Sequence, residues 1–460
     1  MKPTLSLTPT KRLFVEMLTR DIELEDAILD LLDNSVDGAM RSHGYDPQAD
    51  RPYEGFSASL HFSTERFVIA DNCGGIPKEL RDSAFRLGRL DDNIARSLPT
   101  IGSVGIGMKR AIFKLGRNCV IASKTSEDGF RVEIKPEWFK SLTWEVEVEE
   151  TPGQQGGGTT ITATELLPDV AAAFAGPTGF ADRFRSRVSQ YYGILIDKGF
   201  AVIINQKPVV PMPITFKVGE LASAAKGEAI APYIYEGQIG GVNVEVVVGF
   251  YSPFQLDPDE EPIKGKAEEA GWTVVCNDRV VLYKDKTILT GWGDGAPSYH
   301  PQFRQIAGVA VFSSENPELL PLTTTKKGID AQSKIFLETR KRMRDGLAKF
   351  TNYTNRLKRL REPDLAQIFH GTSNVDLRAL RAEKQSLHIE GAKTAGGQGR
   401  VFDFPLPAVG ESTEKKMVFT RPLDRVRKVA KYLFEDPDHA PSEVAAEAFD
   451  QTYKRARGQK

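Results

Sequence analysis

Two glycine-rich segments in the first quarter of the chain limit what it can fold into more than any other feature. The first, Val68-Ile-Ala-Asp71-Asn-Cys-Gly-Gly75-Ile-Pro77, puts a carboxylate at a predicted strand end beside a glycine pair. The second, Ile101-Gly-Ser-Val-Gly-Ile-Gly107-Met-Lys109, is a glycine-rich turn that opens a predicted helix. Glycines let the backbone approach a ligand closely, and free amides at a helix start point toward an anion. The two segments therefore predict a nucleotide site, to which Lys109 adds a positive charge.

Two common phosphate loops are excluded by the residues around Lys109. A Walker loop ends in Gly-Lys-Ser or Gly-Lys-Thr, whereas Lys109 follows Met108. In the dinucleotide fingerprint, a third glycine would fall at Arg110. The segment therefore indicates a different nucleotide-binding fold.

Upstream of both segments, Ile22 to Met40 predicts an amphipathic helix. Its apolar side carries Leu24, Ile28, Leu31, Leu32, Val36 and Ala39. Within roughly a third of the circumference on the other side lie Asp26, Asp30, Asp33, Asn34 and Asp37. Such an acidic stripe is more often a solvated face. Its chemistry also suits a nucleotide, because Asn34 could bind magnesium through its amide oxygen while Asp30 could orient and deprotonate a water molecule.

Three motifs resemble the ATP-binding motifs of the GHKL superfamily, which includes gyrase B, the heat-shock chaperone ATPase, histidine kinases, MutL and MORC proteins. They are Asp30-Leu-Leu-Asp33-Asn34-Ser-Val-Asp37, Asp71-Asn-Cys-Gly-Gly75-Ile76 and Ile101-Gly-Ser-Val-Gly-Ile-Gly107-Met-Lys109. A fourth segment, Gly157-Gly-Thr159-Thr-Ile161, resembles the late strand whose threonine supports adenine recognition. The resemblance implies an α/β chain with an α+β sandwich, the Bergerat ATP-binding fold.

The resemblance also implies the roles of individual residues. Asn34 binds magnesium, Asp71 reads the adenine amino group, and Thr159 supports Asp71. The ATP-binding set it implies is Asn34, Asp37, Asp71, Gly75, Ile76, the lid residues Gly102, Ser103, Val104, Gly105, Ile106, Gly107, Met108 and Lys109, and Thr159. The expected cofactors are ATP and Mg²⁺.

The chain departs from these relatives at two positions. MutL-like and MORC-like members have a glutamate as the hydrolytic base where this chain has Asp30, which is one methylene shorter. Asp30 could still position water, or hydrolysis could be slow, or ATP could serve mainly as a conformational switch. Cys73 stands where a glycine is usual, and we expect a buried structural thiol because no nearby histidine could activate it.

The resemblance extends to the domain organisation. Residues 1–168 are expected to form the ATP-binding domain, and residues 179–361 resemble an S5-like transducer domain. Within the latter, the pattern predicts a helix over Phe180 to Tyr192 and strands over residues 201–204, 242–250, 271–276 and 280–283. In relatives, a transducer lysine reaches back to the γ-phosphate, and the best match is Lys327, in preference to Lys326; two ordinary surface lysines are the alternative. Residues 362–460 are expected to be a polar linker and a small C-terminal helical module, with helices predicted over Leu423 to Phe434 and Ser442 to Arg457.

The last part of the transducer-like region predicts a long basic helix over residues 336–361. Phe336, Met343, Phe350 and Leu357 recur every seven residues, and the polar face is strongly positive. Because the whole chain has a formal charge of −1, it gives no global attraction to nucleic acid. The helix could bind DNA or an acidic, DNA-processing partner, or it could simply pack on its own domain with a solvated face.

Composition bounds the remaining expectations. Three widely separated cysteines argue against a disulfide framework, and no apolar run reaches the roughly 20 residues needed to span a bilayer. We therefore expect a cytoplasmic protein without a membrane partner. By analogy with relatives that have a transducer, Leu5 to Leu18 could serve as the strap of an ATP-dependent homodimer.

The expected function is a Mg²⁺-dependent ATPase that acts as an ATP-gated switch or clamp on DNA or on a DNA-processing partner, with phage defence and DNA repair as candidate contexts. The alternative is a chaperone-like ATPase that remodels proteins, or a slow or inactive ATP-binding switch. A histidine kinase is disfavoured, because Lys11 to Met40 leaves no room for a helical hairpin with a phosphoacceptor histidine.

Overall fold

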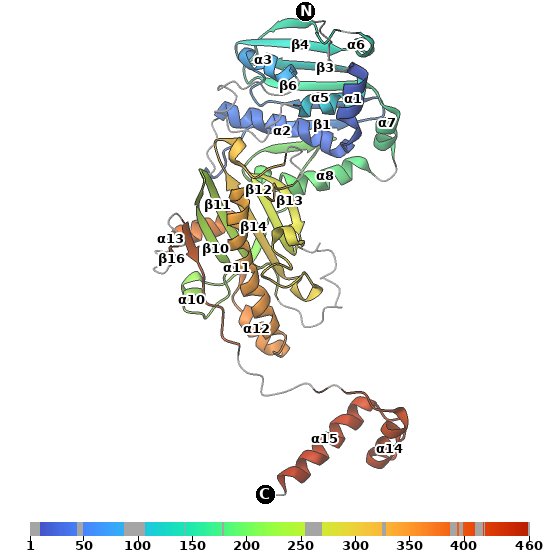
Figure 1. Ribbon diagram of the computed structural model, residues 1–460, viewed down its shortest axis with the longest axis vertical. Helices are drawn as coiled ribbons and strands as arrows, with labels where there is room; N and C mark the ends of the chain where they lie inside the picture. Colours follow the sequence, from blue (N-terminus) through green and yellow to red (C-terminus); the bar gives the residue numbers. More distant parts are fainter. Residues whose placement is uncertain are drawn as a thin grey trace, which may run out of the picture. The chain divides into compact units, whose positions relative to one another are not determined.

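The computed structural model covers the 460-residue chain (Figure 1). It describes residues 10–43, 49–86, 106–141, 143–176, 179–253, 269–323, 328–386, 393–394, 399–409, 417 and 419–458. By their internal contacts the residues form two units, Met1–Val409 and Gly410–Lys460. The larger unit contains two large sheets, each with its own covering helices.

The first sheet is mostly antiparallel, in the order β5-β4-β3-β6-β2-β1-β7-β8. Its strands are β1 (Ser57–Phe62), β2 (Arg66–Asp71), β3 (Gly116–Lys124), β4 (Asp128–Ile134), β5 (Val148–Pro152), β6 (Gly158–Leu166), β7 (Ala201–Ile204) and β8 (Lys207–Pro208). The central strands alternate in burial, as expected for a sheet with one face on a core. This sheet brings the end of β2 next to the start of β6, because β2 and β6 pair antiparallel.

Helices pack on one face of this sheet (Figure 1). The helices of this region are α1 (Lys11–Arg20), α2 (Leu24–His43), α3 (Lys78–Phe85), α5 (Gly107–Leu115), α6 (Pro136–Lys140), α7 (Pro168–Ala175), α8 (Phe180–Tyr191) and α9 (Gly193–Asp197). The predicted helix over 22–40 is α2, which runs three residues further than expected, to His43. On its apolar side, Ile28, Leu32 and Val36 are fully buried in the core of this sheet, whereas Leu24 at its start is partly buried.

The acidic stripe of α2 is not a solvated face. Asp26, Asp30, Asp33 and Asp37 are all buried, and Asn34 is the exposed member of the stripe. A second layer therefore covers this side of α2, and the sequence could not show it because the covering residues lie far away along the chain. The carboxylates have ion-pair and hydrogen-bond partners there, as buried charges require.

The segment after residue 179 differs from the expectation that it opens the second domain. The helix and strand predicted there are present as α8 and β7, but β7 pairs in parallel with β1 and extends the first sheet. Phe180, Phe184 and Val188 of α8 accordingly lie in the first hydrophobic core. The domain boundaries predicted at residues 168 and 361 themselves stay predictions.

The second sheet has the order β13-β12-β14-β11-β10-β17-β16. Its strands are β10 (Tyr233–Ile239), β11 (Val242–Phe250), β12 (Gly271–Cys276), β13 (Arg279–Asp285), β14 (Ile306–Ser313), β16 (Lys393–Thr394) and β17 (Gly399–Phe402). The strands predicted over 242–250, 271–276 and 280–283 are confirmed. Beside β12, Gly308 allows close packing, because a Cβ there would lie 2.5 Å from the Trp272 ring.

The long helix predicted over 336–361 is α11 (Lys334–Leu357), which begins two residues earlier, ends four residues earlier and packs on this sheet. All four residues of the seven-residue repeat, Phe336, Met343, Phe350 and Leu357, are fully buried. Smaller elements complete the unit: β9 (Thr215–Val218), α10 (Leu221–Ala225), η1 (Ile288–Thr290), η2 (Pro301–Phe303), η3 (Pro317–Leu319), α12 (Glu362–Phe369), β15 (Ser373–Asp376) and α13 (Leu377–Ser386).

The C-terminal unit is a helical hairpin of α14 (Leu423–Phe434) and α15 (Pro441–Arg457), and both helices agree with the sequence prediction. Ala430 and Val444 are buried between them, and the rings of Phe434 and His439 stack 4.0 Å apart. Across the described part of the chain, no helix combines the length and apolar character that a membrane crossing needs.

Candidate functional site

Asp71, at the C-terminal end of β2, is held by hydrogen bonds from three directions. The Ser35 hydroxyl of α2 donates to Oδ2 at 2.9 Å. The backbone amides of Cys73 and Thr159 donate to Oδ1 at 3.0 and 3.1 Å. Burial raises the pKa of Asp71, an effect that these hydrogen bonds oppose. The carboxylate is thus fixed in orientation where β2, β6 and α2 meet.

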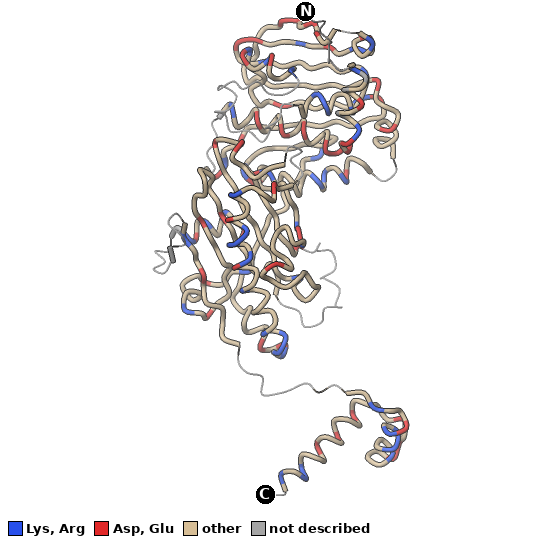
Figure 2. The backbone as a smooth tube through the Cα atoms, in the orientation of Figure 1, with Lys and Arg blue, Asp and Glu red and all other residues tan. Residues whose placement is uncertain are grey.

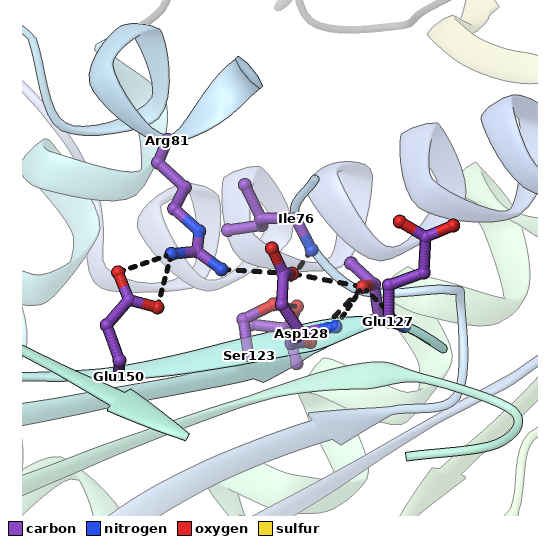
Figure 3. A network of polar contacts seen from close by, with 8 residues as sticks. Ile76, Arg81, Ser123, Glu127, Asp128 and Glu150 are labelled. Carbon is purple, nitrogen blue, oxygen red and sulfur yellow. Dashed lines mark hydrogen bonds and ion pairs between the residues drawn. The ribbon is translucent and has the colours of Figure 1, made fainter. Parts of the chain in front are cut away.

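Thr159 joins the same network through Ser123 of β3. The two hydroxyl oxygens are 2.9 Å apart, and the Ser123 hydroxyl also accepts a hydrogen bond of 2.8 Å from the amide of Ile76. Figure 3 shows Ser123 below Ile76, with the dashed contact between them. The sequence-predicted residues Asp71, Ile76 and Thr159 therefore lie together, and Ser123, which sequence reasoning missed, links two of them.

Glycines allow the turn after Asp71 to lie directly against the sheet. A Cβ on Gly75 would lie 2.0 Å from the carbonyl oxygen of Lys124, and one on Gly158 would lie 2.0 Å from that of Asp71. Gly75 also has a φ of +73°, in the left-handed region. On α2, a Cβ on Gly38 would lie 2.7 Å from the Cys73 carbonyl oxygen. Side chains are excluded at these positions because backbone meets backbone.

Cys73 itself is buried, as expected for a structural thiol. Burial raises its pKa, so the reactive thiolate is strongly disfavoured. Gly38 packs against the backbone of Cys73, and the Cys73 carbonyl accepts a hydrogen bond of 3.2 Å from the Ser42 hydroxyl. Cys73 therefore fastens the turn to α2.

An ion-pair network outside the turn holds α3 in place (Figure 3). Arg81 of α3 contacts both carboxylate oxygens of Glu150 at 3.0 and 2.9 Å, and its other terminal nitrogen lies 3.0 Å from Asp128. The guanidinium group also stacks over Phe130, 4.7 Å from the ring centroid. These contacts tie the helix after the Gly75 turn to β4 and β5.

Asp30, the predicted base, is buried and paired with an arginine. Arg110, in the first turn of α5, donates from Nη2 to Asp30 Oδ2 at 2.6 Å. A Cβ on Gly107 would lie 3.3 Å from the Asp30 side chain, so the start of α5 rests directly on this carboxylate. The Nε of Arg110 is buried and has no hydrogen-bond partner among the described residues. Sequence analysis missed Arg110, although it follows Lys109 directly.

Lys109 is directed at the protein in this structure. Its side chain is 5% exposed, and Nζ donates to the Ala84 carbonyl of α3 at 2.6 Å. Burial lowers the pKa of Lys109 from 10.5 to about 8. Its neighbour Met108 is also buried, whereas Ile106 and Gly107 are partly exposed at the start of α5.

The other α2 residues predicted for the site differ in exposure. Asn34 is exposed, one turn from Asp30, whereas Asp37 is buried. Arg41, which sequence reasoning missed, donates to the carbonyls of Gly75 at 3.1 Å and Asp37 at 3.4 Å. Burial lowers the pKa of Arg41. This arginine therefore joins α2 to the turn that follows Asp71.

Five predicted site residues, Gly102, Ser103, Val104, Gly105 and Lys327, lie outside the described residues. The structure brings together Asp71, Gly75, Ile76 and Thr159, and it places Asp30 against the start of α5.

Comparison with known proteins identifies this region. Residues 22–152 match the family model described as "Histidine kinase-, DNA gyrase B-, and HSP90-like ATPase". The matched segment spans α2, β2, the Gly75 turn and α5, and it ends at the last residue of β5. A search of curated proteins gives no match to the chain. A GHKL-type ATPase domain is therefore present, and it indicates ATP binding and hydrolysis.

Proposed function

We propose that this protein is a Mg²⁺-dependent ATPase that uses ATP as a conformational switch, with a transducer region of the MORC or MutL kind. The observation that carries the proposal is the Asp71 carboxylate, buried at the end of β2 and fixed by Ser35, Cys73 and Thr159 inside a matched ATPase domain. A fixed acceptor in a partly dry site suits a specific amino group.

The residues at this end fit an adenine. Asp71 accepts the hydrogen bond of the amino group, and Thr159 and Ser123 keep the surrounding hydroxyl groups in place. Because Gly75 and Gly158 have no side chains, the walls of the site around the turn are formed by backbone atoms. A base that lacks the amino group leaves a buried acceptor without a partner, which gives selectivity.

The residues present also fit a magnesium ion bound to a nucleotide. Asn34 would hold it through its amide oxygen, and Asn34 is the exposed member of a stripe whose carboxylates are buried and paired. One protein ligand is enough for Mg²⁺, which usually keeps waters and phosphate oxygens as its other ligands. The ion would neutralise phosphate charge and orient the terminal phosphate.

Asp30 is proposed to orient the attacking water and accept its proton. In this structure Arg110 occupies one carboxylate oxygen, so Asp30 must exchange this partner for water before it can act. Arg110 has a further N–H without a partner among the described residues, which suits it to an anionic phosphate. This exchange, with the shorter Asp side chain, supports slow hydrolysis.

The second sheet and α11 are proposed to act as the transducer, with Lys327 as the sensor of the terminal phosphate. DNA or a DNA-processing protein is the proposed partner, and Figure 2 shows basic residues at several points along α11. Arg356, Lys358 and Arg359 are exposed at the C-terminal end of this helix and just beyond it. An ATP-dependent homodimer, formed through the segment that includes α1, belongs to the same proposal.

One observation favours the alternative, a protein-remodelling ATPase. Arg340 and Arg344 both contact Asp294 at 2.8 and 3.0 Å, and Lys349 pairs with Asp403. These three basic residues thus neutralise acids of the same region and offer less charge to DNA phosphates.

Turnover and binding measurements test the proposal. ATP binding and hydrolysis are measured for wild type, Asn34→Ala and Asp30→Asn, with and without duplex DNA. We expect Asn34→Ala to lose Mg²⁺-dependent binding and Asp30→Asn to bind ATP without hydrolysing it. Full turnover in Asp30→Asn would remove Asp30 as the base, and an absence of any DNA effect would favour the remodelling alternative.

A further inference from the structure

The β12–β13 hairpin of the second sheet ends in a buried turn that contacts residues packed around the first sheet. Cys276 and Arg279 pair across it, and the two residues between them, Asn277 and Asp278, have φ values of 45° and 64°. Two left-handed residues make the tight turn whose twist suits a hairpin. All three residues from 277 to 279 are at least 95% buried. A polar hairpin tip of this kind is normally solvated, so its burial calls for a reason.

Arg279 reaches the helix of the nucleotide site. Its Nε donates to Asp33 Oδ1 at 2.9 Å, and both side chains are almost completely buried. The guanidinium group also lies over the ring of Tyr192, 4.4 Å from the centroid. Burial lowers the pKa of Arg279, but the Asp33 carboxylate outweighs it, so the net pKa is raised and the charge is kept.

Tyr192, from the core of the first sheet, completes the contact. Its hydroxyl lies 2.5 Å from Asp33 Oδ1 and 3.0 Å from the Leu29 carbonyl oxygen, so it touches α2 at two points one turn apart. Asp33 stands directly before Asn34 and three residues after Asp30. Asp33, the ion-pair partner of Arg279, therefore lies on the same turn of α2 as the proposed base and the proposed magnesium ligand.

The neighbouring residue of the turn makes a separate contact. Asp278 accepts hydrogen bonds from Lys198 Nζ at 2.9 and 3.0 Å and from the Tyr53 hydroxyl at 2.9 Å. These partners lie after α9 and before β1, not on α2. The hairpin tip thus makes two buried polar contacts with the region of the first sheet, and only the Arg279 contact reaches α2.

We propose that Arg279 is a positioning residue for the nucleotide site, which couples the placement of α2, through Asp33, to the second sheet. This inference rests on the proposed ATPase function and adds a second route between the domains, apart from Lys327. A buried ion pair is firm in one geometry and costly when one partner is left alone, so α2 cannot shift without the hairpin. Because coupling is reciprocal, ATP that moves α2 must also act on the hairpin.

Matched substitutions separate this role from simple attachment of the domains. Arg279→Met removes the contact with α2, and Asp33→Asn keeps an acceptor there but removes its charge. Lys198→Met and Asp278→Asn make the same two kinds of change in the contact beside it. We expect kcat to fall about 10- to 100-fold in Arg279→Met, because small misplacements of catalytic groups have effects of this size. The affinity for a non-hydrolysable ATP analogue should change less than about threefold, and Arg279→Lys should recover part of kcat. The Lys198 and Asp278 variants should keep kcat within about threefold of wild type.

Hydrogen exchange gives a readout that does not depend on turnover. In wild type, the ATP analogue should change the exchange of amides in β12 and β13, and Arg279→Met should abolish this response while Asp278→Asn keeps it. An equal loss of kcat and response in both sets of variants would reduce Arg279 to a structural contact and overturn the inference. Absence of ATP binding in wild type would overturn the proposed function, and this inference with it. ATP binding with an unchanged Arg279→Met variant would overturn this inference alone.

Discussion

The two ends of the proposed nucleotide site are organised in opposite ways. At the adenine end, Asp71 already has its supporting hydrogen bonds from Ser35, Cys73 and Thr159. At the phosphate end, the charged groups are partnered with the protein itself, Arg110 with Asp30 and Lys109 with Ala84. The first end needs no rearrangement to accept a base, whereas the second must exchange partners. The comparison shows that one site can keep a fixed part for adenine recognition and a separate part that rearranges for the phosphates.

The largest effect should come from overpacking the adenine end. In Gly158→Ala, the new Cβ would lie 2.0 Å from the Asp71 carbonyl oxygen, and neither strand can yield without losing pairing. We expect the free energy of unfolding to fall by about 3 kcal/mol, at the upper end of the usual cost of overpacking, in denaturant titrations. Gly328→Ala is the control, because a Cβ there meets nothing within 4 Å. Equal losses in both variants would show that the adenine end is not rigid.

Lys109 gives the phosphate end a pH dependence. Its pKa is about 8 in the folded protein and 10.5 when unperturbed, so between these values the unfolded chain binds more protons. The burial cost is thus present below pH 8 and is relieved as pH rises toward 10.5. Relative to Lys109→Met, wild type should gain about 3 kcal/mol at most over this interval. Denaturant titrations across pH measure it, with the exposed Lys78→Met as control, and a flat difference would contradict the burial of Lys109.

Asp71→Asn tests the fixed acceptor. The substitution keeps the shape but replaces a carboxylate with an amide, so a charge-assisted hydrogen bond to the adenine amino group is weakened. We expect ATP affinity to fall about 30-fold, or about 2 kcal/mol, in equilibrium titrations. Glu127→Gln, which changes an exposed acid near the same strand, should bind like wild type. Unchanged affinity in Asp71→Asn would place adenine recognition elsewhere.

The smallest effect should come from the Asp30 pair. Arg110→Met removes the group that occupies the Asp30 carboxylate, so the base no longer needs to exchange partners. A partly buried pair of this kind is worth about 1 kcal/mol, and we expect kcat to rise up to about fivefold while ATP binding weakens. Single-turnover measurements separate the two quantities. A fall in kcat without weaker binding would mean that Arg110 acts on the terminal phosphate during the reaction.

Much of the fold followed from local pattern. The strands over 242–250 and 271–276 and the helices α8, α14 and α15 lie where periodicity and turn residues placed them, because each has a clear apolar face or sharp boundaries. The pairing of β7 with β1 did not follow, since a short apolar strand carries no mark of the sheet it joins.

The candidate site was predictable to a similar extent. Asp71, Gly75 and Thr159 belong to motifs with a fixed order, and the structure brings them together. Ser123 and Arg279 carry no local signal, because a serine in a strand and an arginine after a turn are ordinary surface patterns. Their importance comes from partners far away in the sequence.

The sequence by itself determined the presence of an ATPase domain, because its motifs place backbone amides and a carboxylate at fixed points of short, local elements. Only the tertiary structure decided which polar residues of α2 face solvent. Asp30, Asp33 and Asp37 look equivalent to Asn34 on a helical wheel, yet all three are buried. Their different surroundings depend on Arg110 and Arg279, which reach α2 from other elements of the fold. Long-range packing sets the electrostatics of this helix, and no local pattern can encode it.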